Sequence, residues 1–204
     1  MEFAVPKWKR TATRVVYENP YVRAHEDILR TPRGATFTSF RVDSPSYAIV
    51  VAVTEAGSIL FVRNYRPAVT AYVLELPGGR IEPGEPPVRT ARRELEEETG
   101  YRGRALVELG WFYPSPARMM SVGRVFLARR VTAGRRHLDV TEDMQTVEVP
   151  VERAYRELRA GKFHDANTMT GLALAEPYLR GPSRTVRSKP LIPRVAGRLR
   201  SGVG

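Results

Sequence analysis

The sequence predicts an α+β or α/β sandwich in which strands pack against two or three helices. Three observations support this prediction: short β-rich runs occupy the first third of the chain, segments with helical signals alternate with later strands, and 42% of the 204 residues are hydrophobic. That hydrophobic content allows a sizeable core and favours a folded domain over disorder. The mixture of strands and helices argues against a helical bundle.

Strand patterns cover most of the chain from Thr11 to Tyr65. Two apolar runs, residues 46–54 and 59–65, flank the turn sequence Glu-Ala-Gly-Ser, and we expect them to form a hairpin buried on both faces. Residues 67–79 are expected to form a short strand that stops at a Pro-Gly-Gly break. The earlier β-rich runs are residues 13–19, 21–30 and 35–42, with a turn at 31–34.

A helix is expected from Pro86 to Thr99. Pro86 and Pro87 suit the first helical turn, where a missing N–H group has no consequence, and Gly100 suits the C-terminal stop. One apolar stripe follows this helix at spacings of three, four and seven residues: Val88, Ala91 and Leu95.

The later segments continue the alternation of strand and helix. A helix is expected from Val151 to Ala160, and a last helix is expected to start at Asp165, a good N-cap, and to run to Leu179. The expected strands are residues 105–113, 123–131 and 145–150, with a polar loop at 132–144 before the third.

The helix that starts near Pro86 concentrates negative charge in a chain whose net charge is +11. Four glutamates lie within five positions: Glu94, Glu96, Glu97 and Glu98. Like charges three or four residues apart on a helix repel. At 100° per residue, Glu94, Glu97 and Glu98 share one flank, where three carboxylates would form a hard-oxygen site for a divalent cation. On the helix alone, a solvated charged face is the more common outcome, and Arg93 could instead orient these carboxylates.

The loop before this helix favours the metal site. Residues 77–85 contain three glycines and two prolines, which fix an irregular backbone path and let carbonyl groups approach a metal or a phosphate. Gly79, Glu85 and residues 93–101 match every defined position of the signature G-x5-E-x7-R-E-U-x-E-E-x-G-U, in which U is a bulky apolar residue and Tyr101 is acceptable as the last one. The chain therefore resembles the Nudix hydrolases.

This resemblance implies an α/β/α sandwich with a mixed sheet, and divalent-metal-dependent cleavage of a nucleoside diphosphate linked to another group X. Mg²⁺ is the expected ion, with Mn²⁺ as an alternative. Glu85 and Arg93 match the residues that brace the motif, and Arg93 and Glu97 are expected to take part in catalysis. The matching metal-ligand positions are Glu94, Glu97, Glu98 and the backbone carbonyl of Gly78.

The sequence around the motif resembles the ADP-ribose pyrophosphatases, which implies hydrolysis of ADP-ribose to AMP and ribose 5-phosphate. Pro116 lies sixteen residues after Gly100, the spacing associated with that subfamily, although Ala117 stands where glycine is common. Arg66 and Arg80 are the expected substrate contacts together with Pro116. An arginine guanidinium group can donate two parallel hydrogen bonds to phosphate oxygens. Three aromatic residues are candidates for base stacking or for the core: Trp111, Phe112 and Tyr113.

In that subfamily the general base lies in a loop late in the chain. The corresponding stretch here points to Glu142, with Asp143 and Asp139 as alternatives. The three histidines have no ligand-like spacing and are expected to be incidental.

The expected domain organisation has three parts. Residues 1–45 resemble a small β domain that exchanges between subunits in the subfamily, so we expect a homodimer with sites built from both chains. Residues 46–179 would form the Nudix domain. Residues 180–204 contain seven basic and no acidic residues and are expected to be a flexible, solvated tail, with nucleic acid or another acidic surface as alternative partners.

Composition narrows the cellular setting. The chain has no cysteine, and its first residues lack the apolar stretch of a signal peptide. The longest apolar run, residues 47–53, is far too short to span a bilayer. We therefore expect a soluble cytoplasmic protein without a membrane partner.

Several other functions remain open at this point. Within the enzyme class, the alternatives are hydrolysis of GDP-mannose or another nucleotide sugar, and hydrolysis of an 8-oxo-guanine nucleotide. Outside it, the chain could be a nucleotide-sugar sensor without catalysis, or an RNA-processing pyrophosphohydrolase tethered by its basic tail. The complete set of Glu94, Glu97 and Glu98 argues against a sensor, which need not keep a full metal site.

Overall fold

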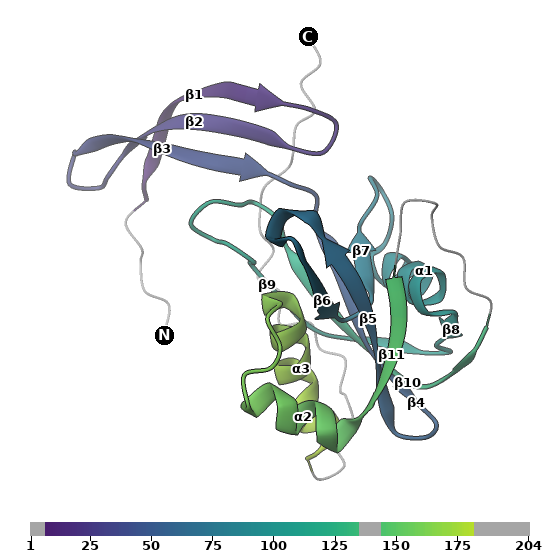
Figure 1. Ribbon diagram of the computed structural model, residues 1–204. Coiled ribbons are helices and arrows are strands. Elements are labelled where there is room, and N and C mark those ends of the chain that lie inside the picture. The colour runs from purple at the N-terminus through teal and green to yellow at the C-terminus, as the bar shows by residue number, and fades with distance from the viewer. Residues whose placement is uncertain (1–6, 135–143, 182–204) are drawn as a thin grey trace.

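The structure is a computed structural model that describes residues 7–134 and 144–181. It contains a small sheet at the N-terminus and a larger mixed sheet with helices on both faces (Figure 1). The small sheet is antiparallel, with the strand order β1 (Lys9–Glu18), β2 (Arg23–Arg30) and β3 (Thr36–Asp43). The three β-rich runs of the sequence are confirmed as its strands.

The larger sheet has the order β11-β5-β4-β10-β8, with β6 beside β5, β7 beside β4 and β9 beside β10. The pairing of β4 with β10 is parallel and the other pairings are antiparallel, which confirms a mixed sheet. Its strands are β4 (Tyr47–Thr54), β5 (Ser58–Arg66), β6 (Ala71–Glu75), β7 (Gly78–Arg80), β8 (Tyr101–Arg102), β9 (Leu106–Phe112), β10 (Gly123–Ala133) and β11 (Met144–Pro150).

Helices cover both faces of this sheet, so the predicted sandwich is confirmed. The helices are α1 (Pro87–Thr99), α2 (Val151–Arg159) and α3 (Ala166–Leu179). Because successive side chains of a strand point to opposite faces, β4 contributes to two cores. Its even-numbered residues from Ala48 to Ala52 pack with Ala91 and Leu95 of α1. Its odd-numbered residues, including Ile49, pack with α2 and α3.

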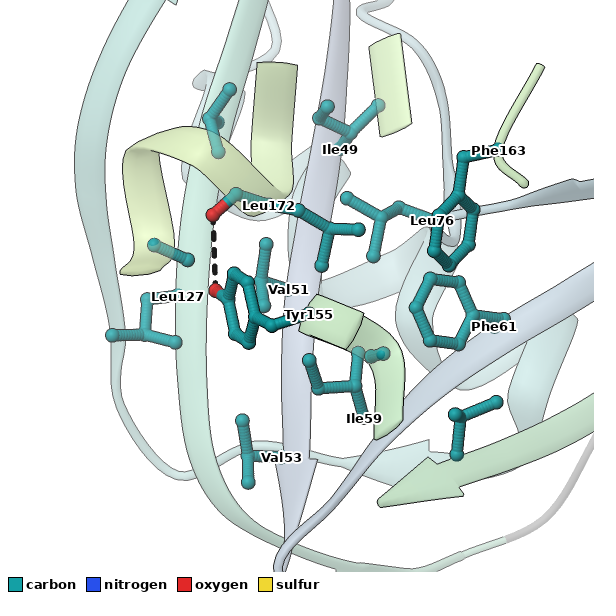
Figure 2. Close-up of a cluster of buried hydrophobic side chains, with 14 residues drawn as sticks. Ile49, Val51, Val53, Ile59, Phe61, Leu76, Leu127, Tyr155, Phe163 and Leu172 are labelled. Carbon is teal, nitrogen blue, oxygen red and sulfur yellow. Dashed lines mark hydrogen bonds between the residues drawn. The ribbon is translucent and has the colours of Figure 1, made fainter. Parts of the chain in front are cut away.

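The core on the α2 and α3 side holds the two C-terminal helices together. Tyr155 of α2 is fully buried, and its hydroxyl donates a hydrogen bond to the carbonyl of Leu172 in α3 at 3.0 Å (Figure 2). Phe61 of β5 stacks on Phe163, with ring centroids 5.3 Å apart (Figure 2). This core fixes where the start of α3 lies relative to the sheet.

The predicted ends of α1 are confirmed. Pro86 is the N-cap residue, and Gly100 is the C-cap with a positive φ of 76°, a conformation that favours glycine. Ala91 and Leu95 are fully buried as expected. The expectation for Val88 was wrong, because this residue in the first turn is 37% exposed.

Helix α3 begins as the sequence predicts and is tied to the larger sheet. One carboxylate oxygen of Asp165, the N-cap residue, accepts a hydrogen bond from the backbone N–H of Thr168 at 2.7 Å. The Thr168 hydroxyl in turn accepts a hydrogen bond from the backbone N–H of Leu76 at 2.9 Å. The start of α3 therefore lies beside the segment that joins β6 to β7.

Residues 67–80 differ from the single short strand that was expected. Residues Pro67–Val69 form a 3₁₀ turn, β6 pairs with β5, and the two glycines after Pro77 form β7 rather than a break. Gly78 lies opposite Ile49 and Gly79 opposite Ala48. A pairing across about 30 residues of chain is a tertiary contact, which the local glycine signal could not predict.

The small sheet exposes much of its apolar surface. All residues of β1 are exposed, and the end of β3 is held by the loop between β9 and β10, where the Val42 N–H donates to the Arg118 carbonyl at 2.7 Å. The most exposed large apolar side chains of this region are Trp8, Tyr17, Tyr21 and Phe40. Across the described residues, no helix has the length and apolar character needed to cross a membrane.

Candidate active site

Two of the predicted metal-binding carboxylates lie against the glycines of β7. A carboxylate oxygen of Glu98 accepts a hydrogen bond from the Gly78 N–H at 2.8 Å, and Glu98 is buried in spite of its charge. The Glu94 carboxylate lies against Gly79, since a Cβ atom added at Gly79 would be 2.2 Å from Glu94 Oε1. Only a residue without a side chain allows this approach.

Gly78 is equally confined, but by backbone atoms. A Cβ atom at Gly78 would lie 2.3 Å from the Ala48 carbonyl oxygen and 2.7 Å from Ile49 Cα. The two glycines thus hold α1 and β4 close to the same short strand. This proximity is what brings the carboxylates of α1 to the backbone of Gly78 and Gly79.

Arg93 connects the acidic residues of the motif. One terminal nitrogen donates to Glu94 Oε1 at 2.8 Å and to Glu97 Oε2 at 2.9 Å, and the other donates to the Arg80 carbonyl at 3.3 Å. Burial disfavours the charged form of Arg93, but the hydrogen bond with Glu85 and the charge of Glu94 raise its pKa above the ordinary value. Arg93 is therefore permanently charged and holds the motif helix to the loop before it.

Glu85 supports Arg93 from the loop. The Thr90 hydroxyl donates to Glu85 Oε2 at 2.8 Å, and Arg93 approaches the same oxygen at 3.4 Å. The hydrogen bond from Thr90 lowers the pKa of Glu85, burial opposes this to a smaller degree, and the bond from Arg93 lowers the pKa further. Glu85 and Arg93 are thus paired, as the motif implied.

By residue type, the donor set fits a hard divalent cation. Glu94 and Glu98 are carboxylates on one helix face, four residues apart, and both lie at the strand that carries the Gly78 carbonyl. Within residues 7–134 and 144–181, no three His, Cys, Asp or Glu side chains stand in an arrangement that could hold a metal ion. Arg93 lies between Glu94 and Glu97 in this structure.

A cavity of about 650 Å³ adjoins the two glycines. Arg66 of β5 and Arg80 of β7, both predicted from the sequence as substrate contacts, line it together with Gly78 and Gly79. Arg80 Nε is buried and has no hydrogen-bond partner within the described part of the chain, and a terminal nitrogen of Arg80 donates to Glu82 Oε2 at 3.2 Å.

Arg66 is held in place by Glu75 of β6. Arg66 Nε donates to Glu75 Oε1 at 2.8 Å, and a second nitrogen donates to the other carboxylate oxygen. This pair raises the pKa of Arg66, and the charges of Glu98 and Asp165 add to the effect. Arg66 therefore lies within electrostatic reach of both the motif helix and the start of α3.

Other predicted contacts do not line this cavity. Pro116 is exposed in the loop between β9 and β10, and it is absent from the cavity lining. Phe112 packs against the core beside Tyr47, with ring centroids 6.2 Å apart, and Trp111 contacts Tyr113. Glu142, Asp143 and Asp139 lie outside the described residues.

The structure also brings to the cavity residues that sequence reasoning did not assign to a site. Tyr47, Glu75, His164, Asp165 and Asn167 all line it. His164 had been expected to be incidental, and Asp165 had been assigned only the role of helix cap. The one local signal was the polar start of α3, and nothing in the sequence showed that this end faces the motif.

Comparison with known proteins agrees with this geometry. Residues 44–170 match the model of the NUDIX domain. The chain is 32% identical to an ADP-ribose pyrophosphatase of Bacillus subtilis (84% of this chain, 92% of that protein) and 28% identical to a methanol dehydrogenase activator of Bacillus methanolicus, with the same coverage. A crystal structure of an ADP compounds hydrolase superposes with a TM-score of 0.79 at 21% identity, covering 90% of this chain and all of that one, and shows the shared fold. With its motif intact on α1 and a family match over more than half its length, the chain belongs to the Nudix family.

Proposed function

We propose that this protein hydrolyses the diphosphate of a nucleotide sugar, and that its substrate is ADP-ribose, which it would split into AMP and ribose 5-phosphate. The observation that carries the proposal is the cavity of about 650 Å³ that joins two arginines to the glycines of the Nudix motif. Its volume lies within the range of small-molecule sites. The name and coverage of the relative from Bacillus subtilis support ADP-ribose over other nucleotide sugars.

Nudix hydrolases generally use divalent metal ions, and we propose Mg²⁺, with Mn²⁺ as a substitute. Glu94, Glu97, Glu98 and the carbonyl of Gly78 would hold the ion. When bound, it supplies neutralisation of the diphosphate oxygens and an acidified water. Glu98 is already oriented by the Gly78 N–H, and Glu94 by its contact with Gly79 and its bond to Arg93.

The arginines of the cavity would bind the diphosphate. Arg80 has a buried, unpartnered Nε within the described residues, and Arg66 is oriented by Glu75 at the cavity wall. Both side chains remain charged at any working pH because guanidinium groups do not lose their proton in proteins. Pro116 stays a predicted contact, through the loop that meets the end of β3. Arg93 would position Glu94 and Glu97 rather than touch the substrate.

The proton of the attacking water needs an acceptor, and Glu142 is the proposed base. Glu142→Gln should lower kcat by about 10²- to 10⁴-fold, because the variant keeps the size of the side chain but cannot take a proton. Mg²⁺ affinity, measured by titration calorimetry, should stay close to that of the wild type. Asp139→Asn tests one of the alternative acids and should keep wild-type activity if Glu142 is the base, whereas full activity of Glu142→Gln would remove Glu142 from this role.

We propose that the chain has three parts, residues 1–45, 46–179 and 180–204, and that the small sheet of the first part pairs with a second copy of the chain and contributes to the substrate site. The exposed aromatic side chains of this small sheet favour burial against a partner. Light scattering should give a mass of twice 23.0 kDa. Phe40→Glu should yield monomers with reduced activity, whereas Lys162→Glu, on the exposed turn before α3, should not. A wild-type monomer would contradict the proposal.

A substrate panel tests the function directly. The purified protein with Mg²⁺ would be offered ADP-ribose, GDP-mannose, an 8-oxo-guanine nucleotide and capped RNA, with products identified by mass spectrometry. The proposal expects AMP and ribose 5-phosphate from ADP-ribose, with the highest kcat/KM of the panel and no turnover in excess chelator. A clear preference for another compound would replace ADP-ribose, and no cleavage of any would reject hydrolysis.

A further inference from the structure

By chemistry, the residues that line the cavity beside Gly78 and Gly79 fall into three groups, which we call walls. Arg66 and Arg80 form a cationic wall. A second wall is apolar and is lined by Tyr21, Val22, Pro45 and Val69. A third, the polar wall, consists of Tyr47, Asp165 and Asn167. A nucleotide sugar has three matching parts: a diphosphate, a flat base and a sugar with several hydroxyl groups.

In the polar wall, Tyr47 fixes the amide of Asn167. The Tyr47 hydroxyl donates a hydrogen bond to Asn167 Oδ1 at 2.6 Å. Burial and then the negative charge of Asp165 raise the pKa of Tyr47 to about 12, so this hydroxyl stays protonated and remains a donor. Because the amide oxygen is occupied, the Asn167 NH₂ group has a defined direction. Its two N–H groups make no hydrogen bond within the described residues.

Asp165 is held equally firmly. One carboxylate oxygen caps α3 through the Thr168 N–H at 2.7 Å, and Thr168 is itself bonded to Leu76. The other carboxylate oxygen accepts no hydrogen bond within the described residues. The wall therefore offers the NH₂ donors of Asn167 beside the free acceptor of Asp165, on rigid supports. A sugar hydroxyl both donates and accepts, so it matches such a pair.

The polar wall lies beside the two arginines that would bind the diphosphate. Tyr47 lies directly opposite Arg80 in the pairing of β4 with β7, and the charge of Asp165 reaches Arg66. A phosphate is a poor occupant of the wall itself, since Asp165 and the neighbouring Glu75 are negatively charged. A base is better matched by the apolar wall, which aromatic and aliphatic side chains form. The sugar of X is the part that remains.

We propose that Tyr47, Asp165 and Asn167 bind the hydroxyl groups of the sugar in X and thereby select which nucleotide sugars are hydrolysed. This inference rests on the proposed function. It assigns Asn167 and Asp165 as specificity-determining contacts and Tyr47 as a positioning residue that orients the Asn167 amide. Neither residue type nor spacing in the sequence indicated these roles.

The test compares two substrates that share the same ADP half. One is ADP-ribose, and the other is ADP carrying a methyl ester on its β-phosphate, which has no sugar in X and is followed as a substrate or as a competitive inhibitor. Asn167→Leu should lower kcat/KM for ADP-ribose on the order of 10- to 100-fold, because the hydroxyl groups lose their partner. Kinetics or inhibition with the methyl ester should change by less than about 2-fold, within the range of a neutral substitution.

Two further variants guard against a folding artefact. Tyr47→Phe should reproduce the selective loss for ADP-ribose to a smaller degree, about 3- to 10-fold, since it frees the Asn167 amide without removing it. Tyr155→Phe is the matched control, because it also removes a tyrosine hydroxyl bonded to α3 but does not line the cavity. It should leave the ratio between the two compounds unchanged.

Each other outcome has a distinct meaning. Equal losses for both compounds in Asn167→Leu and Tyr47→Phe would overturn the inference, because the wall would then act on the shared ADP half. Unchanged kinetics for both compounds would overturn it as well. If the wild type cleaves neither compound and binds neither, the proposed function fails, and this inference fails with it. If the wild type is active but the variants show no selective loss for ADP-ribose, the proposed function stands and this inference fails.

Discussion

Glu98→Gln is expected to abolish most of the catalytic activity while leaving the fold intact. The Gly78 N–H that now donates to Glu98 at 2.8 Å can donate equally to the amide oxygen of glutamine, so the side chain keeps its place beside β7. The variant loses the negative charge that would be offered to the cation and that also acts on Arg66. Because a metal contributes several kcal/mol to charge stabilisation in the transition state, turnover should fall about 10²- to 10³-fold or more.

The measurement is kcat as a function of Mg²⁺ concentration, together with the melting temperature. Half-maximal activity should require more Mg²⁺ in the variant, and the melting temperature should change little. Glu96→Gln is a matched control on the same helix, since Glu96 pairs with Arg102 at 2.7 Å and lies off the predicted metal flank. Its activity should stay within about 2-fold of the wild type. Wild-type turnover and Mg²⁺ dependence in Glu98→Gln would remove Glu98 from the metal site.

The second large effect is expected from Gly79→Ala, which should separate activity from stability. The added Cβ would lie 2.2 Å from Glu94 Oε1 and 2.4 Å from Glu94 Cδ, at the far end of a flexible side chain. Glu94 can rotate away, so the fold should tolerate the change. A displaced ligand is costly for catalysis, however, because a shift of about 1 Å in a reacting group can reduce the rate by about 10²-fold.

Gly78→Ala is the comparison, and here the larger expected effect is on stability rather than on activity. Its Cβ would meet the Ala48 carbonyl oxygen and Ile49 Cα, which are backbone atoms of the central strand β4. These atoms cannot move without loosening the pairing of β4 with β7, so overpacking should destabilise the protein by about 1–3 kcal/mol or more.

Chemical denaturation and kcat/KM for both glycine variants distinguish the two cases. Gly79→Ala should unfold at nearly the same denaturant concentration as the wild type but with much lower kcat/KM. Gly78→Ala should unfold at clearly lower concentration. An active Gly79→Ala variant would show that the contact between Gly79 and Glu94 is not needed for the placement of the metal ligand.

Local patterns predicted the elements of this fold well where one physical rule dominated. Helix α1 was predicted to within one residue because proline and glycine define its ends through backbone conformation alone. Strands β4 and β5 were predicted as buried on both faces from their continuous apolar runs, and the structure confirms this for β4 and for residues 59–62 of β5, whereas Arg63, Tyr65 and Arg66 are exposed. Where two rules competed, the prediction failed. Pro-Gly-Gly was interpreted as a break because glycine weakens strands, yet pairing with β4 overrides that tendency in β7.

The sequence by itself determined the chemistry, because the motif is local. Glu85, Arg93, Glu94, Glu97 and Glu98 lie within fourteen positions, and helical geometry alone places the last three on one flank. The tertiary structure decided what this chemistry faces. Gly78 meets Glu98 through strand pairing, and the start of α3 meets the motif through a bond between Leu76 and Thr168, which are 92 residues apart. Such contacts depend on how distant segments pack, and no local pattern of residues specifies that packing.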